Sequence, residues 1–194
     1  MNLAPGVLFD EVKHEYFYKG KRLSGITGLI SKKLNLKYSK EFVGEHTEEG
    51  IHVHKAIQRW IQTGSSGSIH PGVAWLTGAF RAHYPDGRLY SEVLVTDYEH
   101  YASSVDIILD TGNGLVLFDI KKGVFKRDYV TWQLSVYKTF AESFLSQAAP
   151  RGVACTQIKD CVCICLKDKE FYPIFPKVEK DVTAMLYGRQ MATV

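Results

Sequence analysis

The chain has no apolar run that approaches the roughly 20 residues of a membrane-spanning helix. Its first residues, 1–6, lack the basic start and the apolar stretch of a signal peptide. It also contains no internal repeat and no low-complexity segment. These absences exclude repeat architectures and predict a cytoplasmic protein without a membrane partner.

A strong excess of charge of either sign is also missing. The formal net charge is +3 over 194 residues, with 45% hydrophobic and 23% charged residues. This composition argues against disorder, collagen and coiled coil, and it permits a nucleic-acid partner without requiring one. The length predicts a single domain over 1–194, with an N-terminal hairpin and helices in 1–85, a central core in 86–145 and C-terminal strands and a helix in 146–194.

Cysteine is scarce and unevenly placed, because all four cysteines lie between positions 155 and 165. Cys161, Cys163 and Cys165 alternate, so a strand would place them on one face, where they are poorly placed to pair with each other. An iron–sulfur cluster needs thiolates from separated segments, so none is expected. We interpret these cysteines as small hydrophobic residues on a half-buried strand of a protein in a reducing compartment.

Hydrophobic periodicity and turn residues predict an α/β (α+β) fold with a central mixed β-sheet flanked by helices. Ser24 or Thr27 is the expected cap of the first helix. The expected elements are a hairpin over 6–18, helices over 24–34, 39–61 and 71–84, strands over 89–96, 101–109 and 115–121, a helix over 127–145, strands over 157–166 and 171–175, and a helix over 177–191.

The central hairpin carries three charged residues that point to chemistry. Asp119 and Lys121 are two apart on one strand and therefore share a face, while Asp106 lies on the preceding strand. A turn centred on residues 112–113 places Asp106 opposite Asp119, and a turn centred on 113–114 places it opposite Lys121. Both registers bring the three side chains to one face. The opposite face is expected to be apolar, with Val105, Ile107, Leu109, Val116, Phe118 and Ile120.

Two carboxylates about 5 Å apart repel each other unless a cation or a proton separates them. A hard divalent ion fits this arrangement, and Mg²⁺ (or Mn²⁺) is the natural choice. Such an ion polarises a phosphate and lowers the pKa of a bound water, while Lys121 positions that water or stabilises charge on the phosphate. The alternative is a solvated hairpin face with a cross-strand ion pair, which Asp-x-Lys alone would favour.

Further motifs flank the hairpin, and Gln133 and Tyr137 share one helical face. The ordered set is Gly50-x-x-x-His54, Glu92, Asp106, Asp119-x-Lys121 and Gln133-x-x-x-Tyr137. It resembles the PD-(D/E)XK nuclease superfamily, in particular its RecB-type exonuclease branch, which includes mitochondrial genome-maintenance exonuclease and CRISPR-associated exonucleases. The opening segments 16–20 and 23–27 are similar too, and the resemblance spans roughly residues 7 to 175.

The resemblance implies a restriction-endonuclease-like core and a role for each matching residue. It implies metal ligation by His54, Asp106, Asp119 and the backbone carbonyl of Ile120, catalytic roles for Asp106, Asp119 and Lys121, and a supporting or DNA-contacting role for Gln133 and Tyr137. Glu92 is a candidate additional acid. The chain departs from the branch at Glu49, at Gln58 and at 101–104, where an arginine, an acid and a glycine are common, and this predicts a weaker grip on DNA or metal.

Cations and an aromatic residue follow the catalytic strand. Lys122, Lys126, Arg127 and Trp132 are candidate DNA contacts, with Trp132 stacking on a base. The alternatives are a solvated charged face for the cations, a core position for Trp132 and Tyr137, and an ordinary helix position for His54.

Together these features predict a Mg²⁺- or Mn²⁺-dependent DNA exonuclease that acts on DNA ends or single strands, in DNA repair, recombination or phage DNA metabolism. A structure-specific endonuclease or a nuclease subunit of the same fold is one alternative. A non-catalytic DNA- or protein-binding module is the other, although such a module has no need for two facing acids.

Overall fold

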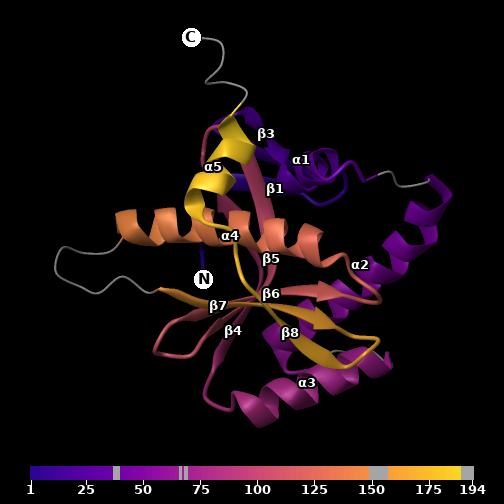
Figure 1. Ribbon diagram of the computed structural model, residues 1–194. Coiled ribbons are helices and arrows are strands. Elements are labelled where there is room, and N and C mark those ends of the chain that lie inside the picture. The colour runs from indigo at the N-terminus through magenta and orange to yellow at the C-terminus, as the bar shows by residue number, and fades with distance from the viewer. Residues whose placement is uncertain (37–39, 66, 68–69, 149–156, 189–194) are drawn as a thin grey trace.

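The computed structural model describes residues 1–36, 40–65, 67, 70–148 and 157–188, with side chains described outside 40–49 (Figure 1). Its helices and strands match most of the ranges expected from the sequence. The strands are β1 (Val7–Asp10), β2 (Glu15–Tyr18), β3 (Lys21–Gly25), β4 (Arg88–Thr96), β5 (Tyr101–Asp110), β6 (Leu115–Lys121), β7 (Ile158–Cys165) and β8 (Glu170–Ile174). The helices are α1 (Ile26–Lys33), α2 (Lys40–Thr63), α3 (Pro71–His83), α4 (Arg127–Ala148) and α5 (Glu179–Tyr187).

The strands form one mixed sheet in the order β1-β2-β3-β5-β6-β7-β8, with β4 paired to β5. The pairs β3–β5 and β6–β7 are parallel, and the others are antiparallel. The ten-residue β5 is the centre, because it pairs with β3 at its start, β6 at its end and β4 along its length. The predicted mixed sheet flanked by helices is therefore confirmed.

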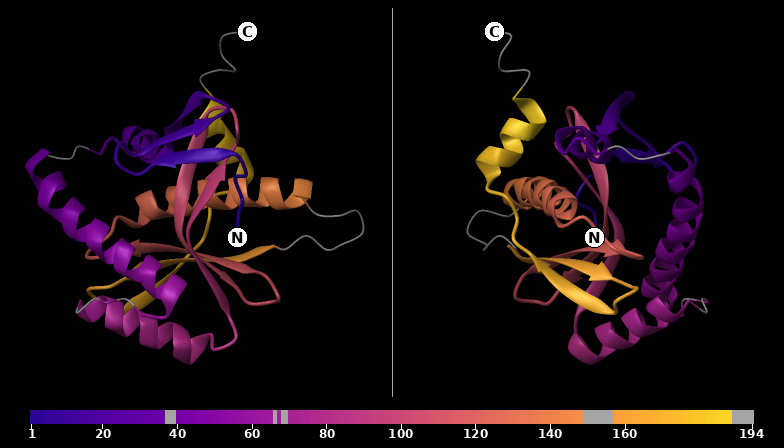
Figure 2. Two further views of the ribbon diagram at one scale, coloured as in Figure 1. Left: turned by 180° about the vertical axis from the view of Figure 1, so that it is seen from behind. Right: turned by 45° about the vertical axis from the view of Figure 1, so that its right-hand side comes forward.

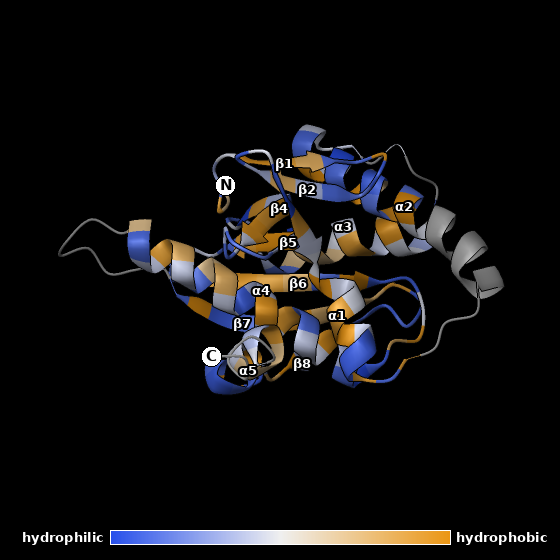
Figure 3. Ribbon diagram, turned by 90° about the horizontal axis from the view of Figure 1, so that it is seen from above, coloured by the Kyte–Doolittle hydropathy of each residue, from blue (hydrophilic) through white to orange (hydrophobic). Residues whose placement is uncertain are grey.

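Helices cover both faces of the sheet (Figures 2 and 3). From above, α2 and α3 lie on one side of β6, and α1, α4 and α5 lie on the other. The α2-side core joins Ile57 and Phe80 to Phe118 of the sheet. The α4-side core joins Val136 and Phe140 to Leu117. Burial of apolar side chains on both faces explains the continuous apolar run 115–118 of β6, in which every residue is buried.

The segment before α1 differs from the expectation. Residues 21–25 form β3, whose Ser24 pairs with Tyr101 of β5 and is therefore extended. The helix begins at Ile26 with Gly25 as its N-cap and without a side-chain cap bond. Neither Ser24 nor Thr27 caps it, so that prediction was wrong. A long-range strand pairing overrode the local capping signal.

The β5–β6 hairpin has the first of the two registers considered. Ile107 pairs with Phe118 and Asp110 with Leu115, and continuing this ladder places Asp106 opposite Asp119. The loop 111–114 contains Gly114 at φ +154, where an added Cβ would lie 2.4 Å from Lys159 Cγ. Glycine is required there because any side chain would clash with the start of β7.

Side-chain alternation changes along β4 and β5, which the sequence did not indicate. Glu92 has a φ of +48, and the ladder pairs Ser91 with Ile107 and Val93 with Val105 but omits Glu92 and Asp106. Val105 consequently belongs to the α4-side core, whereas Ile107 belongs to the α2-side core. Assigning Val105 to the same face as Ile107 was therefore wrong, because the side-chain alternation changes where the ladder omits Glu92 and Asp106.

The face that carries Asp119 is also buried rather than solvated. Leu117, two residues earlier, is fully buried in the α4-side core, and Asp119 itself has 0% exposure. The solvated hairpin face considered as an alternative is therefore excluded. Asp119 instead lies at the end of an apolar layer on the α4 side of the sheet.

The three alternating cysteines are buried on β7, with Cys161 and Cys163 in the α4-side core. Their role as small hydrophobic residues is confirmed, on a strand more deeply buried than expected. Burial raises the pKa of Cys161 to about 12 and also raises the pKa values of Cys163 and Cys165. Cys155 lies outside the described residues.

We predict that these three thiols resist modification in the folded protein. A Cys155→Ser variant should react negligibly with Ellman's reagent at about pH 8, because a buried thiol with a raised pKa presents almost no thiolate. Guanidinium chloride should expose all three. Rapid modification of the folded variant, followed by absorbance, would contradict this burial.

Candidate metal and catalytic site

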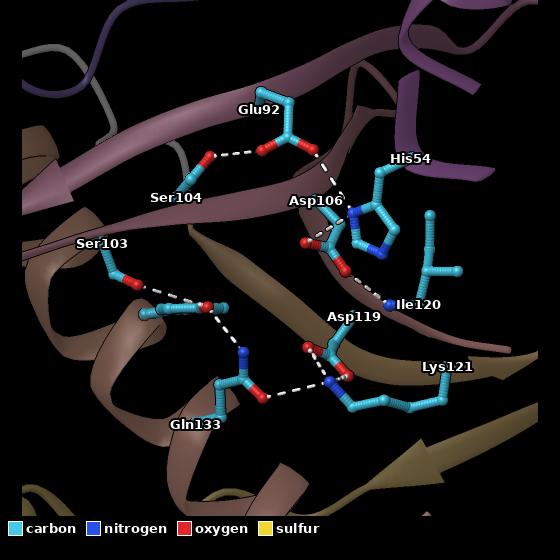
Figure 4. Close-up of polar contacts among 10 residues, drawn as sticks. His54, Glu92, Ser103, Ser104, Asp106, Asp119, Ile120, Lys121 and Gln133 are labelled. Atoms are coloured by element: carbon cyan, nitrogen blue, oxygen red, sulfur yellow. Dashed lines mark hydrogen bonds and ion pairs between the residues drawn. The ribbon is translucent and has the colours of Figure 1, made fainter. Parts of the chain in front are cut away.

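His54 of α2 meets two acids of the sheet (Figure 4). Its Nδ1 lies 3.4 Å from Glu92 Oε1 of β4 and 3.6 Å from Asp106 Oδ1 of β5. One ligand atom from each of the three half-buried residues lies within 4.8 Å of the others. We call His54, Glu92 and Asp106 the HED cluster.

Local structure orients both acids of the HED cluster. The left-handed backbone of Glu92 turns its carboxylate toward α2, and Ser104 Oγ donates a hydrogen bond of 2.8 Å to Glu92 Oε2. The Ile120 backbone N–H donates to Asp106 Oδ2 at 2.6 Å. A charged acceptor makes such a bond short and strong. The strained backbone at Glu92 is an observed outlier of the kind that accumulates at functional sites.

The charges of the HED cluster are interdependent. Burial lowers the pKa of His54, but the negative charges of Asp106 and Glu92 outweigh burial and raise this pKa to about 9. Burial raises the pKa of Asp106, and its partner His54 acts in the opposite direction. In the absence of another cation the imidazole is therefore protonated and provides the positive charge that the acids require.

A second group adjoins the HED cluster on β6 and α4. Lys121 Nζ lies 2.8 Å from Asp119 Oδ2, donates to Asp119 Oδ1 at 3.0 Å and donates to Gln133 Oε1 at 3.3 Å. Gln133 Nε2 donates to Tyr137 Oη at 2.7 Å, and Ser103 Oγ donates to the same hydroxyl at 3.4 Å. Figure 4 shows these contacts as one continuous chain.

This second group keeps Lys121 charged. Burial lowers the pKa of Lys121, but the charges of Asp119 and Asp106 outweigh burial and raise it. Burial raises the pKa of Tyr137 well above its ordinary value, so its hydroxyl stays protonated. Tyr137 and Gln133 are buried and hold Lys121 through hydrogen bonds. The core position considered for Tyr137 is correct, and the same side chain also belongs to the polar chain.

The residues present fit a hard divalent ion. The HED cluster offers two carboxylates, the ligands that suit Mg²⁺ or Mn²⁺, together with one imidazole. Asp119 Oδ2 is buried and, despite its proximity to Lys121, has no hydrogen bond of good geometry. Lys121 already compensates the charge of this carboxylate, so the fit to a divalent ion rests on the HED cluster.

The structural grouping differs from the predicted ligand set. Glu92, expected only as an additional acid, contacts His54 directly, while Asp119 lies outside the HED cluster and pairs with Lys121. Ile120 contributes a backbone N–H to Asp106, and the role expected for its carbonyl stays a prediction. Because strand register decides which acid faces α2, spacing along the chain could not separate the two groups.

The candidate DNA contacts are placed unevenly. Lys126 and Arg127 are exposed, Lys122 is half-buried, and Arg127 Nη1 donates to the Pro173 carbonyl at 3.2 Å. Trp132 is only 8% exposed and belongs to the α4-side core. Lys33 Nζ lies 4.5 Å from its ring centroid. The core position considered for Trp132 is therefore correct, and a base could stack on it only after displacement of its neighbours.

Ser103 and Ser104 were not singled out by sequence reasoning, although both contact the site. They hold Tyr137 and Glu92, respectively. The only signal was their position immediately before Asp106, in the segment where the nuclease branch often has glycine. No characteristic sequence spacing relates a serine hydroxyl to its hydrogen-bond partner. The partners of Ser103 and Ser104 could therefore be identified only from the folded structure.

Comparisons with known proteins yield a weak structural similarity. No protein-family model and no curated protein matches the chain. Five chains of known structure show similarity, among them one described as "Crystal structure of SSO0001". That similarity has a TM-score of 0.39 and 15% sequence identity, and it covers 92% of this chain and 80% of the other. Within the part of the chain that the structure describes, no helix is both long and apolar enough to cross a membrane.

We predict that protonated His54 stabilises the metal-free fold. Because its pKa of about 9 exceeds the unfolded value near 6.5, this contribution is complete below pH ~6.5 and disappears as pH rises through 9. In EDTA, His54→Gln should lower the free energy of urea unfolding by about 1 kcal/mol at acidic pH, allowing for partial solvent screening, and by less above pH ~9.5. An effect independent of pH would contradict the assigned charge.

We also predict strong coupling between Lys121 and Asp119. Lys121→Met should destabilise the fold by about 2–4 kcal/mol, because it leaves a buried carboxylate without its cation. The double variant Lys121→Met/Asp119→Asn should recover much of this loss in urea unfolding. Additive losses would show that the pair contributes no mutual stabilisation.

Proposed function

We propose that the chain is a metal-dependent deoxyribonuclease of the PD-(D/E)XK type with a restriction-endonuclease-like core, acting as an exonuclease on DNA ends or single strands. The observation that carries this proposal is the juxtaposition of the HED cluster with the buried Asp119–Lys121 pair. A purely structural core would gain little from two acids and a histidine in contact, since each must be desolvated.

His54, Glu92 and Asp106 would hold the ion, with Asp119 adjoining them. When bound, Mg²⁺ or Mn²⁺ supplies an activated water and polarises a phosphate oxygen. Both acids of the HED cluster already have a hydrogen-bond donor, Ser104 for Glu92 and Ile120 N–H for Asp106, so their carboxylates are oriented before binding.

Lys121 is the residue suited to contact the phosphate. Its side chain is 28% exposed, whereas that of Asp119 beneath it is fully buried. Asp119 and Gln133 fix the ammonium, which can therefore stabilise developing negative charge without reorganising. Gln133 and Tyr137 are positioning residues, because they act on Lys121 through hydrogen bonds and are themselves buried.

The buried, unpaired cysteines suit the reducing cytoplasm proposed for this protein. A role in DNA repair, recombination or phage DNA metabolism follows from the proposed reaction. The phosphodiester of DNA is the proposed substrate, and Lys126 and Arg127, which are exposed just after β6, are the proposed contacts to its backbone.

Cleavage of end-labelled single- and double-stranded DNA tests this proposal directly. We expect cleavage with Mg²⁺ or Mn²⁺ and none with EDTA. Asp106→Asn, Asp119→Asn and Lys121→Met should each reduce the rate by at least about 100-fold, because each removes an interaction with the reacting phosphate or its ion.

Asp160→Asn is the matched control, since Asp160 is an exposed carboxylate on the neighbouring strand β7. It should cleave like the wild type. Cleavage that survives EDTA or the loss of Asp119 would overturn the mechanism. Binding of DNA without cleavage under any metal would favour a non-catalytic binding module, and circular DNA opened without a free end would indicate an endonuclease.

A further inference from the structure

A basic cavity of about 670 Å³ lies beyond the HED cluster, between α2 and the start of β4. It is broad and open to solvent. The lining residues that matter for its chemistry are Trp60, Ile61, Arg81, Arg88, Tyr90 and Ser91. The proposed reaction does not account for this cavity.

The cavity lies along the same two elements, α2 and β4, that contribute His54 and Glu92 to the HED cluster. Ile61 lies seven residues after His54 on α2, so both are on one helical face about 10 Å apart along the axis. Ser91, the residue immediately before Glu92 on β4, also lines the cavity, and it pairs with Ile107 of the α2-side core. A ligand that extends from the HED cluster along α2 and β4 therefore enters the cavity.

The charge of the cavity selects an anion. Two arginines line it, and the described lining residues include no carboxylate. Arg81 Nη2 donates to the Gly64 carbonyl at 3.2 Å, which fixes the guanidinium at the rim. The Arg88 guanidinium lies 5.4 Å from the Tyr90 ring centroid. A guanidinium has five N–H donors in a planar fork that matches a phosphate, so one anchoring contact leaves donors for a ligand.

We infer that this cavity binds a backbone phosphate of the same nucleic-acid strand that reacts at the HED cluster. The inference rests on the proposed nuclease function and extends it to a binding site for the strand. At about 3.4 Å of rise per nucleotide, the offset of about 10 Å along α2 corresponds to about three nucleotides. Arg81 and Arg88 anchor the strand at this distance and set the length of substrate that binds well.

The test is binding of a fluorescein-labelled single-stranded DNA of about 12 nucleotides, which is long enough to span the HED cluster and the cavity. Anisotropy is measured in EDTA over a series of NaCl concentrations, so that cleavage does not interfere. We expect Arg81→Gln/Arg88→Gln to weaken binding about tenfold and to reduce the salt slope by about 0.7, the value for one lost phosphate contact to a single strand. Arg22→Gln is the matched control, because Arg22 is exposed on β3 and pairs with Glu15.

A second variant guards against loss of folding. Arg81→Lys/Arg88→Lys keeps both charges and should retain most of the salt slope while losing the planar fork. Wild-type affinity and slope in the glutamine variant would overturn the phosphate site, even if the wild type cleaves DNA. Arginine-dependent binding by a wild type that cleaves nothing with Mg²⁺ or Mn²⁺ would support the phosphate site and overturn the nuclease.

Discussion

The buried carboxylate of Asp119 imposes the constraint on which the site depends. A charge with 0% exposure, at the end of an apolar layer, requires a cation, and Lys121 is the one the structure provides. Lys121 donates a hydrogen bond to Gln133, and Gln133 donates one to Tyr137. These bonds connect α4 to β6 in addition to the apolar packing between them. Structural stability and the proposed chemistry therefore use the same side chains.

The second determinant is the irregularity where β4 and β5 pass the site. The left-handed Glu92 interrupts the ladder beside Asp106, and the strands change the face on which their apolar residues are buried. Glu92 and Asp106 lie opposite each other between the pairs Ser91–Ile107 and Val93–Val105, so the two acids share a face of the sheet. The irregularity lets both reach His54, and Ser104 compensates by bonding the displaced carboxylate.

Much of the fold was predictable, because long periodic segments and turn residues determine element type locally. The central hairpin, the helix that follows it and the alternating cysteines were all anticipated. Ser24 shows the limit, since its capping signal yielded to a parallel pairing with β5. Val105 shows a second limit. Period-two alternation assumes a regular strand, and the sequence around Glu92 does not indicate its left-handed backbone.

The sequence by itself determined which chemical groups are available: two acids and a lysine on one hairpin, a histidine on an earlier helix, and a glutamine and a tyrosine one turn apart. Only the tertiary structure decided which of these groups contact one another. It joined Glu92, rather than Asp119, to His54 and Asp106, and it buried Trp132 beneath Lys33. The physical reason is that a side chain's partners depend on strand register, local irregularity and helix docking, which involve residues far apart in the chain.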